Sequence, residues 1–138
     1  MVDNKFLKGK ISLVTGASRG IGKSISLALA EAGSEVILSA KTVEKLNRVK
    51  SEIEKNGGKA EVLPVDLSKT ADIINIFKKI NKRYGRIDIL VNNAAIGIFG
   101  YMADLTIEDL KKTYDVNVKS VFTSCKEALK MMIPQKNG

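Results

Sequence analysis

The fold of this chain is decided by one stretch of sequence, TGASRGIG, which runs from Thr15 to Gly22. Directly before it, residues 11–14 form a short apolar run typical of a buried strand. Directly after it, apolar residues recur at helical spacing until Gly33. Glycines at such a junction permit a tight turn, and the helix N-terminus that follows presents unpaired N–H groups with a partial positive charge. The stretch therefore predicts a loop that holds a pyrophosphate, with an ordinary glycine turn as the alternative.

Outward from this loop, short apolar runs alternate with helical patterns. We expect strands at 11–14, 36–39, 59–65 and 87–91, with helices between them at 21–32, 42–56 and 71–84. Ser68 or Thr70 is the expected cap of the third helix. A last helical pattern opens at Thr106, either runs on or breaks and restarts, and ends at Pro134. Strands that alternate with helices predict the α/β class, with a parallel sheet covered by helices on both faces. The order of the motifs along the chain and right-handed crossovers predict a Rossmann-like sheet with strand order 3-2-1-4.

The composition places the chain among soluble globular proteins. It has 138 residues, of which 44% are hydrophobic and 28% charged, so one domain with a sizeable core is expected. No apolar run approaches the roughly 18 residues of a membrane span, and the charged N-terminal stretch 1–10 is followed by no apolar segment. Cys125 is the one cysteine and histidine is absent, which argues against a disulfide and a metal site. We expect a cytoplasmic protein without a membrane partner.

The net charge of +8 raises the possibility of a nucleic-acid partner. Only four of the 23 basic residues are arginines, the lysines are scattered along helical stretches, and aromatic residues make up 5%. A base-stacking surface needs more aromatic side chains than that. We therefore expect a solvated lysine-rich surface and no nucleic-acid partner.

The residues after the second expected strand bear on the choice of nucleotide. An acidic side chain there would hold a ribose 2′-hydroxyl and favour NAD, but the chain has Ala40 followed by Lys41. Lys41 offers an ammonium, Arg19 in the glycine loop offers a guanidinium, and Ser18 adds a hydroxyl. A guanidinium binds phosphate bidentately. The pattern favours NADP over NAD, unless both cations are merely solvated surface residues.

Four motifs, taken together, resemble the short-chain dehydrogenase/reductase family over essentially the whole chain. The first is TGxxxGxG, with glycines at 16, 20 and 22, and the second is Asp66-Leu67 after the third strand. The third is Asn92-Asn93-Ala94-Ala95 after the fourth strand, which has Ala95 where the family has glycine. The fourth is Asn117, which matches the asparagine of the family's Asn-Ser-Tyr-Lys tetrad.

The resemblance implies a role for each of these positions. Asp66 would bond the adenine amino group, and Asn117 would be the catalytic-centre asparagine that orders a water beside the catalytic lysine. The alternative for Asn117 is local bonding that bends its helix. The residues expected to bind the cofactor are Gly16, Ser18, Arg19, Gly20, Ile21, Gly22, Lys41, Asp66, Leu67, Asn93 and Ala94.

The family's catalytic tyrosine and lysine, YxxxK, have no match in this chain. Four places after Tyr84, Tyr101 and Tyr114 stand Asp88, Leu105 and Val118. Family members run to about 250 residues, so we expect residues 1–138 to be an NAD(P)-binding Rossmann domain truncated after its fourth βα unit. Two functions stay open. One is the cofactor-binding half of an NADP-dependent oxidoreductase for small-molecule carbonyls or alcohols, inactive alone, and the other is a non-catalytic nucleotide-binding or interaction module.

The fourth expected strand points to assembly. In the family this strand is interior, whereas here 87–91 would be an edge with unpaired backbone groups. Val118, Val121, Phe122 and Cys125 cannot all face one sheet, so some of them should be exposed. In the family the same helix commonly packs against its copy. We expect a homo-oligomer, or a complex with a chain that supplies further strands.

Overall fold

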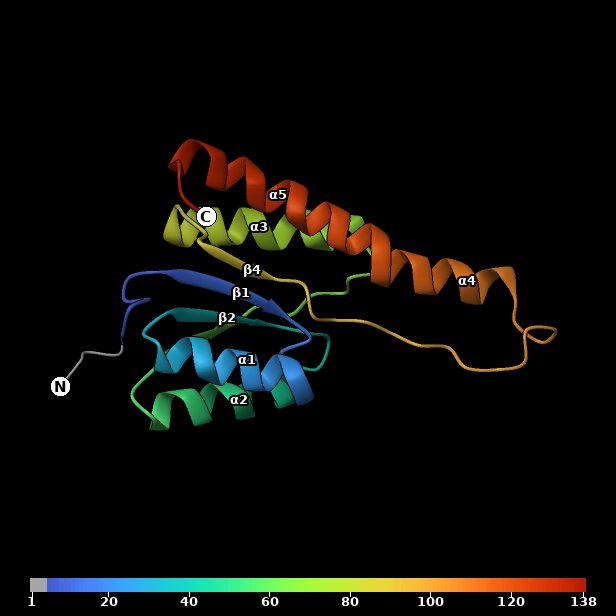
Figure 1. Ribbon diagram of the computed structural model, residues 1–138, viewed down its shortest axis with the longest axis horizontal. Helices are drawn as coiled ribbons and strands as arrows, with labels where there is room; N and C mark the ends of the chain where they lie inside the picture. The colour runs from blue at the N-terminus through green and yellow to red at the C-terminus, as the bar shows by residue number, and fades with distance from the viewer. Residues whose placement is uncertain (1–4) are drawn as a thin grey trace.

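A computed structural model describes residues 5–138 of the chain (Figure 1), so the first four residues of the N-terminal stretch lie outside the described part. The strands are β1 (Ile11–Thr15), β2 (Glu35–Ser39), β3 (Lys59–Val62) and β4 (Ile89–Val91). The helices are α1 (Gly20–Glu31), α2 (Val43–Lys55), α3 (Thr70–Tyr84), α4 (Ile107–Tyr114), the π-helix η1 (Asp115–Lys119) and α5 (Ser120–Gln135). All strand pairs are parallel, and the order is β3-β2-β1-β4. The predicted fold class and strand order are confirmed.

Helices cover both faces of the sheet, with α1 and α2 on one face and α3 and α5 on the other (Figure 1). Successive residues of each strand point to opposite faces, and both sets are apolar. Leu13 and Ile37 join the core that includes Ile73 and Ile80 of α3. Val14, Val36 and Leu38 join the second core, with Leu46, Val49 and Ile53 of α2. The continuous apolar runs of the sequence are therefore strands buried on both sides.

Most helix ends follow the predicted signals. Gly85 ends α3 in the left-handed conformation, and Thr106 opens α4 with a capping box to Asp109. The cap predicted at Ser68 or Thr70 is wrong, because Lys69 is the N-cap of α3 and makes no side-chain cap bond. The hydroxyl of Ser68 donates to Asp66 instead.

Pro134 was predicted to end the last helix, and this prediction is also wrong. Pro134 lies inside α5, which ends at Gln135 and is followed by Lys136 in the left-handed conformation. The fixed φ of proline is compatible with a helix, and only Gln135 follows Pro134 in α5, so the proline costs one N–H bond and disturbs no further turn.

The third strand is shorter than predicted, although the chain continues beside β2. The N–H groups of Leu63 and Val65 donate to the carbonyls of Leu38 and Ala40 at 3.1 and 3.2 Å. Pro64 between them has no N–H, but its nitrogen faces the open side of this edge strand, so no bond to β2 is lost. These bonds keep residues 63–65 beside β2 as far as its carboxyl end, directly before Asp66.

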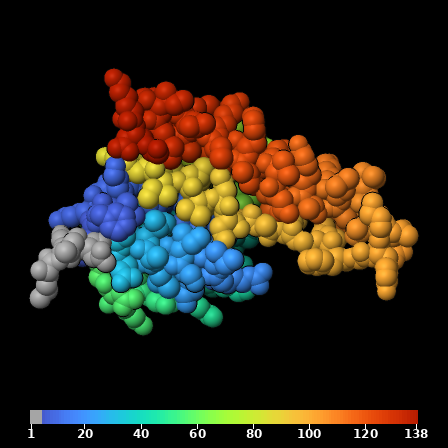
Figure 2. Space-filling model, in the orientation of Figure 1, coloured from blue at the N-terminus to red at the C-terminus, as the bar shows by residue number. Residues whose placement is uncertain are grey.

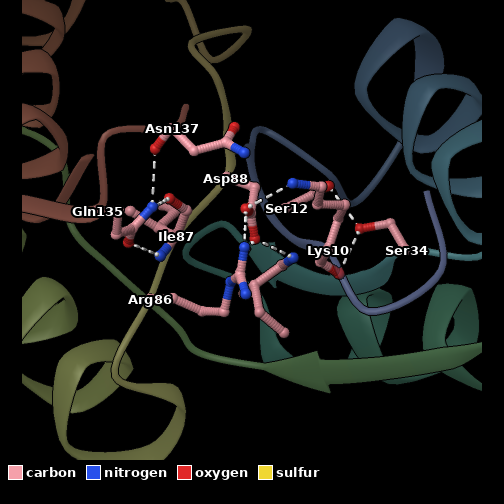
Figure 3. A network of polar contacts seen from close by, with 9 residues as sticks. Lys10, Ser12, Ser34, Arg86, Ile87, Asp88, Gln135 and Asn137 are labelled. Carbon is pink, nitrogen blue, oxygen red and sulfur yellow. Dashed lines mark hydrogen bonds and ion pairs between the residues drawn. The ribbon is translucent and has the colours of Figure 1, made fainter. Parts of the chain in front are cut away.

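The fourth strand begins at Ile89 and not at residue 87, and a side chain bonds to the backbone on the open side of this edge strand. The Gln135 Oε1 accepts from the Ile87 N–H at 2.9 Å, and its Nε2 donates to the Ile87 carbonyl at 2.8 Å (Figure 3). A carboxamide has the same donor and acceptor as a backbone peptide group. The backbone of Ile87, expected to be unpaired, is therefore satisfied, which protects this end of the edge.

Asp88 holds the start of β4 to the start of β1. Its side chain is only 3% exposed and accepts from the Ile11 N–H at 2.9 Å, from Lys10 Nζ at 3.3 Å and from two nitrogens of Arg86 (Figure 3). Burial alone would raise the pKa of Asp88, but the bonds from Arg86, Ile11 and Lys10 outweigh it and lower that pKa. Asp88 is thus a structural anion.

We expect Asp88→Asn to lower the free energy of unfolding by about 2 kcal/mol at pH 7, because an amide cannot accept these bonds as an anion does. The folded pKa is depressed, so the stabilisation is present above the ordinary value of 3.8 and is lost as the pH falls below it. Chemical denaturation of the wild type and the variant at pH 7 and pH 3 measures this.

Asp104→Asn is the matched control, since Asp104 is exposed and forms no ion pair with residues 5–138. A difference between wild type and Asp88→Asn that is as large at pH 3 as at pH 7 would show that the ionised carboxylate is not what stabilises the fold.

Candidate functional site

The predicted site lies where the strand order reverses, at the carboxyl ends of β1 and β4. From β1 the chain proceeds to β2 on one side, whereas β4 lies on the other side. Ligands of open α/β sheets bind at such a point. The glycine loop 15–22 follows β1, and the segment 92–95 follows β4, so the topology brings two of the four motifs together.

Thr15 and Asn93 join these two segments. The Thr15 hydroxyl donates to the Val91 carbonyl at 3.3 Å and accepts from the N–H groups of Asn93 and Ala94, both at 3.1 Å. Asn93 Nδ2 donates to the Thr15 carbonyl at 3.0 Å and to the Gly16 carbonyl at 3.4 Å. The amide of Asn93 is thus bonded to the loop itself, and both segments form one polar unit.

The three glycines of the motif have different roles. A Cβ at Gly16 would lie 2.8 Å from Asn93 Nδ2, and a Cβ at Gly22 would lie 2.3 Å from the Gly16 carbonyl oxygen. Gly16 and Gly22 therefore allow the loop to pack against Asn93 and against itself. Gly20 has a positive φ of 53°, and a Cβ there would meet no atom within 4 Å. Only Gly20 faces open space, in which an anionic group fits.

The N-terminus of α1 is directed into the same region. Its N-cap Arg19 makes no side-chain cap bond, and the first turn contains no acidic residue. The N–H groups of this turn are therefore left for another acceptor. Arg19, Gly20 and Ile21 are exposed, Ser18 is partly exposed and Gly22 is buried. Uncapped N–H groups, the helix dipole and an exposed guanidinium together favour a phosphate at this place.

Lys41 and Asp66, predicted to serve different parts of a nucleotide, are bonded to each other. Lys41 Nζ lies 3.0 Å from Asp66 Oδ1. The same oxygen accepts from the N–H of Ser68 at 3.0 Å and from its hydroxyl at 2.7 Å. The hydroxyl of Ser68 is the largest cause that lowers the pKa of Asp66 to about 2, with burial opposing it and Lys41 adding to it. Asp66 is therefore ionised at any physiological pH.

The remaining predicted residues lie apart from the loop's open face. Leu67 is buried in the core beside α3, so only its backbone is available to a ligand. Asn117 lies in the π-helix η1, where its Oδ1 accepts from the Ile96 N–H at 2.9 Å and its Nδ2 donates to the Ile96 carbonyl at 2.8 Å. Its bonds reach the segment after β4 and not the helix's own backbone, so Asn117 fixes that segment.

The sequence analysis gave no site role to two residues of the site, Thr15 and Ser68. Thr15 is the hub of the bonds between the loop and the β4 segment, and Ser68 holds the carboxylate of Asp66. The signal for Ser68 was present, since an Asp two residues before a Ser favours a local side-chain turn. Nothing in the local sequence indicates that Thr15 bonds to a segment more than 70 residues away.

Within residues 5–138, no group of three or more acidic or cysteine side chains is placed to hold a metal ion. No helix of that range has the length and apolar character needed to cross a membrane.

The comparisons with known proteins agree on one family. The family model described as short chain dehydrogenase matches residues 10–138. A sepiapterin reductase of Chlorobaculum tepidum is 36% identical over 135 residues, which cover 93% of this chain and 55% of that protein. A 3-oxoacyl-[acyl-carrier-protein] reductase of Synechocystis is also 36% identical, over 96% of this chain and 54% of its own length. This chain thus spans about half the length of these curated relatives.

Solved structures agree as well. A metagenomic short-chain oxidoreductase, solved in complex with NADP, superposes with a TM-score of 0.93 and is 38% identical. The match covers 96% of this chain and 60% of that one.

We expect Gly22→Ala to lower the free energy of unfolding by about 3 kcal/mol, because its methyl group would overlap the Gly16 carbonyl. This loss outweighs the better helix propensity of alanine. Gly20→Ala is the matched variant, since it meets only the backbone strain of its left-handed conformation and should cost about 1 kcal/mol. Thermal unfolding of both variants measures the difference. Equal losses would mean that close packing inside the loop is not what Gly22 provides.

Proposed function

Because this chain belongs to the short-chain dehydrogenase family, we propose that it forms the NADP-binding half of an oxidoreductase acting on a small carbonyl or alcohol. The observation that carries the proposal is the uncapped N-terminus of α1 next to the open space at Gly20. A pyrophosphate bound there accepts from the N–H groups of Gly20, Ile21 and Gly22. The loop keeps this shape because Asn93 Nδ2 donates to the carbonyls of Thr15 and Gly16, and the Ala94 N–H donates to the Thr15 hydroxyl.

NADP is favoured over NAD by the charges around the ribose position. Ala40 provides no carboxylate to repel a 2′-phosphate, and the Arg19 guanidinium is exposed, with no ion pair to any residue in 5–138. Ser18 and Lys41 add a hydroxyl and an ammonium. Asp66 would accept from the adenine amino group of the bound cofactor, and the backbone of Leu67 would be available beside it. The NADP complex of a similar short-chain oxidoreductase supports this choice.

The bound cofactor supplies the hydride chemistry, and this chain supplies binding and orientation. None of the tyrosines at 84, 101 and 114 has a lysine four residues later, so we propose that the chain alone does not reduce carbonyl compounds. Asn117 holds the segment after β4 by its two bonds to Ile96.

The second candidate function is a non-catalytic nucleotide-binding or interaction module. It rests on the lack of a tyrosine followed by a lysine four residues later. NADPH oxidation that co-purifies with the chain would contradict both the inactivity and the second candidate.

The location in the cytoplasm and the lack of a nucleic-acid partner stay predictions of the sequence.

For assembly, we propose that two copies of the chain associate through α4, η1 and α5. Large apolar side chains follow one face of these helices at intervals of mostly three or four residues, and they are exposed: Ile107, Leu110, Tyr114, Val118, Phe122, Leu129 and Ile133. In Figure 2 the residues of these helices, coloured orange to red, lie along the top of the molecule and reach to the right beyond the blue and green part. An exposed apolar stripe of this length marks an interface.

We expect Arg19→Ala to weaken NADP binding by about 1.5–3 kcal/mol more than NAD binding, since only NADP carries the 2′-phosphate that a guanidinium holds. Titration calorimetry with both nucleotides measures the loss. Arg48→Ala, an exposed arginine on α2, removes the same charge and should alter neither affinity. Equal affinity of the wild type for NAD and NADP would refute the cofactor assignment.

We expect Phe122→Glu to shift the assembly towards monomers, because Phe122 is 69% exposed in the centre of the stripe. Sedimentation velocity at micromolar concentration measures this shift. Ile89→Lys tests the other possible contact, the edge of β4, and should leave the assembly intact if the helices form it. A wild type that sediments as one monodisperse monomer contradicts the proposal.

A further inference from the structure

A cavity of about 490 Å³ opens between α3 and α5, which lie side by side on one face of the sheet (Figure 1). Its lining residues all fall within 77–85 and 127–135, so it lies at the C-terminal ends of both helices. These ends are near the amino end of β4, whereas the glycine loop follows the carboxyl end of β1. The volume is in the range of cavities that hold small molecules.

Three apolar side chains line this cavity: Phe77, Met131 and Pro134. Phe77 is only 3% exposed and belongs to the core beneath α3, and Met131 packs against the same core. The thioether of a methionine adapts its shape to a neighbour and contacts aromatic rings favourably. A flat apolar group, such as an aromatic ring, therefore fits this part of the lining.

The charged side chains of the lining leave one cation without a partner. Lys130 Nζ lies 2.6 Å from Glu127 Oε1, so these two charges offset each other. Lys78 forms no ion pair with any residue in 5–138. Asn81, one turn after Lys78 on the same side of α3, also lines the cavity and offers an amide donor. The lining thus has one net positive charge beside an apolar surface.

We propose that this cavity is a second ligand site, separate from the nucleotide site, and that it binds an aromatic carboxylate. The ring packs on Phe77 and Met131, and the carboxylate accepts from the Lys78 ammonium and the Asn81 amide. A single negative charge balances the single unpaired cation, whereas a second one would lie near Glu127 with no free cation to offset it.

The C-terminal ends of the two helices do not oppose an anion here, although such ends carry a partial negative charge. The last turn of α3 contains Lys82 and Arg83, which offset that charge. At the end of α5 the N–H groups of Lys136 and Asn137 donate to carbonyls of the last turn. The negative ends of both helices are therefore compensated within the chain.

The cavity also lies apart from the apolar stripe proposed for assembly. Successive residues of an α-helix are rotated by about 100°, so Met131 and Pro134 lie on a different side of α5 from Phe122 and Leu129. A second copy bound to the stripe therefore leaves the cavity open to a ligand.

The test measures the binding of 2-naphthoate and of its neutral analogue 2-naphthamide to the whole chain by titration calorimetry. We expect the wild type to bind the carboxylate more tightly than the amide. Lys78→Met should weaken 2-naphthoate binding about two- to fivefold, which is the strength of an exposed ion pair, and leave 2-naphthamide binding unchanged. Met131→Ala should weaken both ligands, because it removes part of the apolar lining.

Two controls locate the ligand. Lys79→Met removes an exposed lysine of α3 that does not line this cavity, and it should leave both affinities unchanged. Because an anion could also bind at the glycine loop, 2-naphthoate is titrated into Arg19→Ala and into the wild type with NADP added. Neither change should alter its affinity.

The outcomes separate this site from the proposed function. If Lys78→Met leaves 2-naphthoate unchanged or weakens both ligands equally, recognition of the carboxylate by Lys78 is refuted. If Arg19→Ala weakens 2-naphthoate and NADP displaces it, the ligand occupies the nucleotide site and the second site is refuted. A wild type that binds neither probe at millimolar concentration also refutes the second site, and NADP binding is then unaffected.

Discussion

The hydrogen bonds of Thr15 and Asn93 are the constraint on which the rest of the site depends. They join the end of β1 to the segment after β4, although these residues are more than 70 positions apart. Parallel strands bring their carboxyl ends to the same edge, but without a polar connection the two loops there could move independently. Because Asn93 bonds to the backbone of the glycine loop, the loop has one shape, and the N-terminus of α1 points in one direction.

The different roles of Gly16, Gly20 and Gly22 follow from this constraint. Gly16 and Gly22 have no side chain because Asn93 and the loop's own carbonyl occupy the space, and Gly20 is the position that leaves space open. A binding loop thus needs glycine for packing within the protein as much as for approach to a ligand. The cations around the loop differ in a similar way, since Arg19 is unpaired within the described residues, whereas Lys41 is bonded to Asp66.

Along β4 the sheet has an open edge, and contacts within the chain satisfy part of it. Asp88 ties β4 to β1, and Gln135 supplies a peptide-like group to Ile87, so that the first part of the edge is satisfied from within the chain. The outer face of α4, η1 and α5 is different, because nothing in the described residues covers its apolar side chains. At Ile87 one polar side chain is enough to satisfy the backbone groups of the edge, whereas apolar area is removed from water only by another surface.

The sequence by itself determined the order of strands and helices, the parallel sheet and the place of the glycine loop. These depend on periodicity, on glycines and on the handedness of crossovers, which are local properties. It failed at Pro134 and at the expected cap of α3, where a helix end depends on the neighbouring chain as well as on residue type. Only the tertiary structure decided that Lys41 bonds to Asp66, that Gln135 bonds to Ile87 and that Asn117 bonds to Ile96. Each of these contacts joins residues at least 21 positions apart, and a side chain's partner at that range is set by packing and not by its neighbours in sequence.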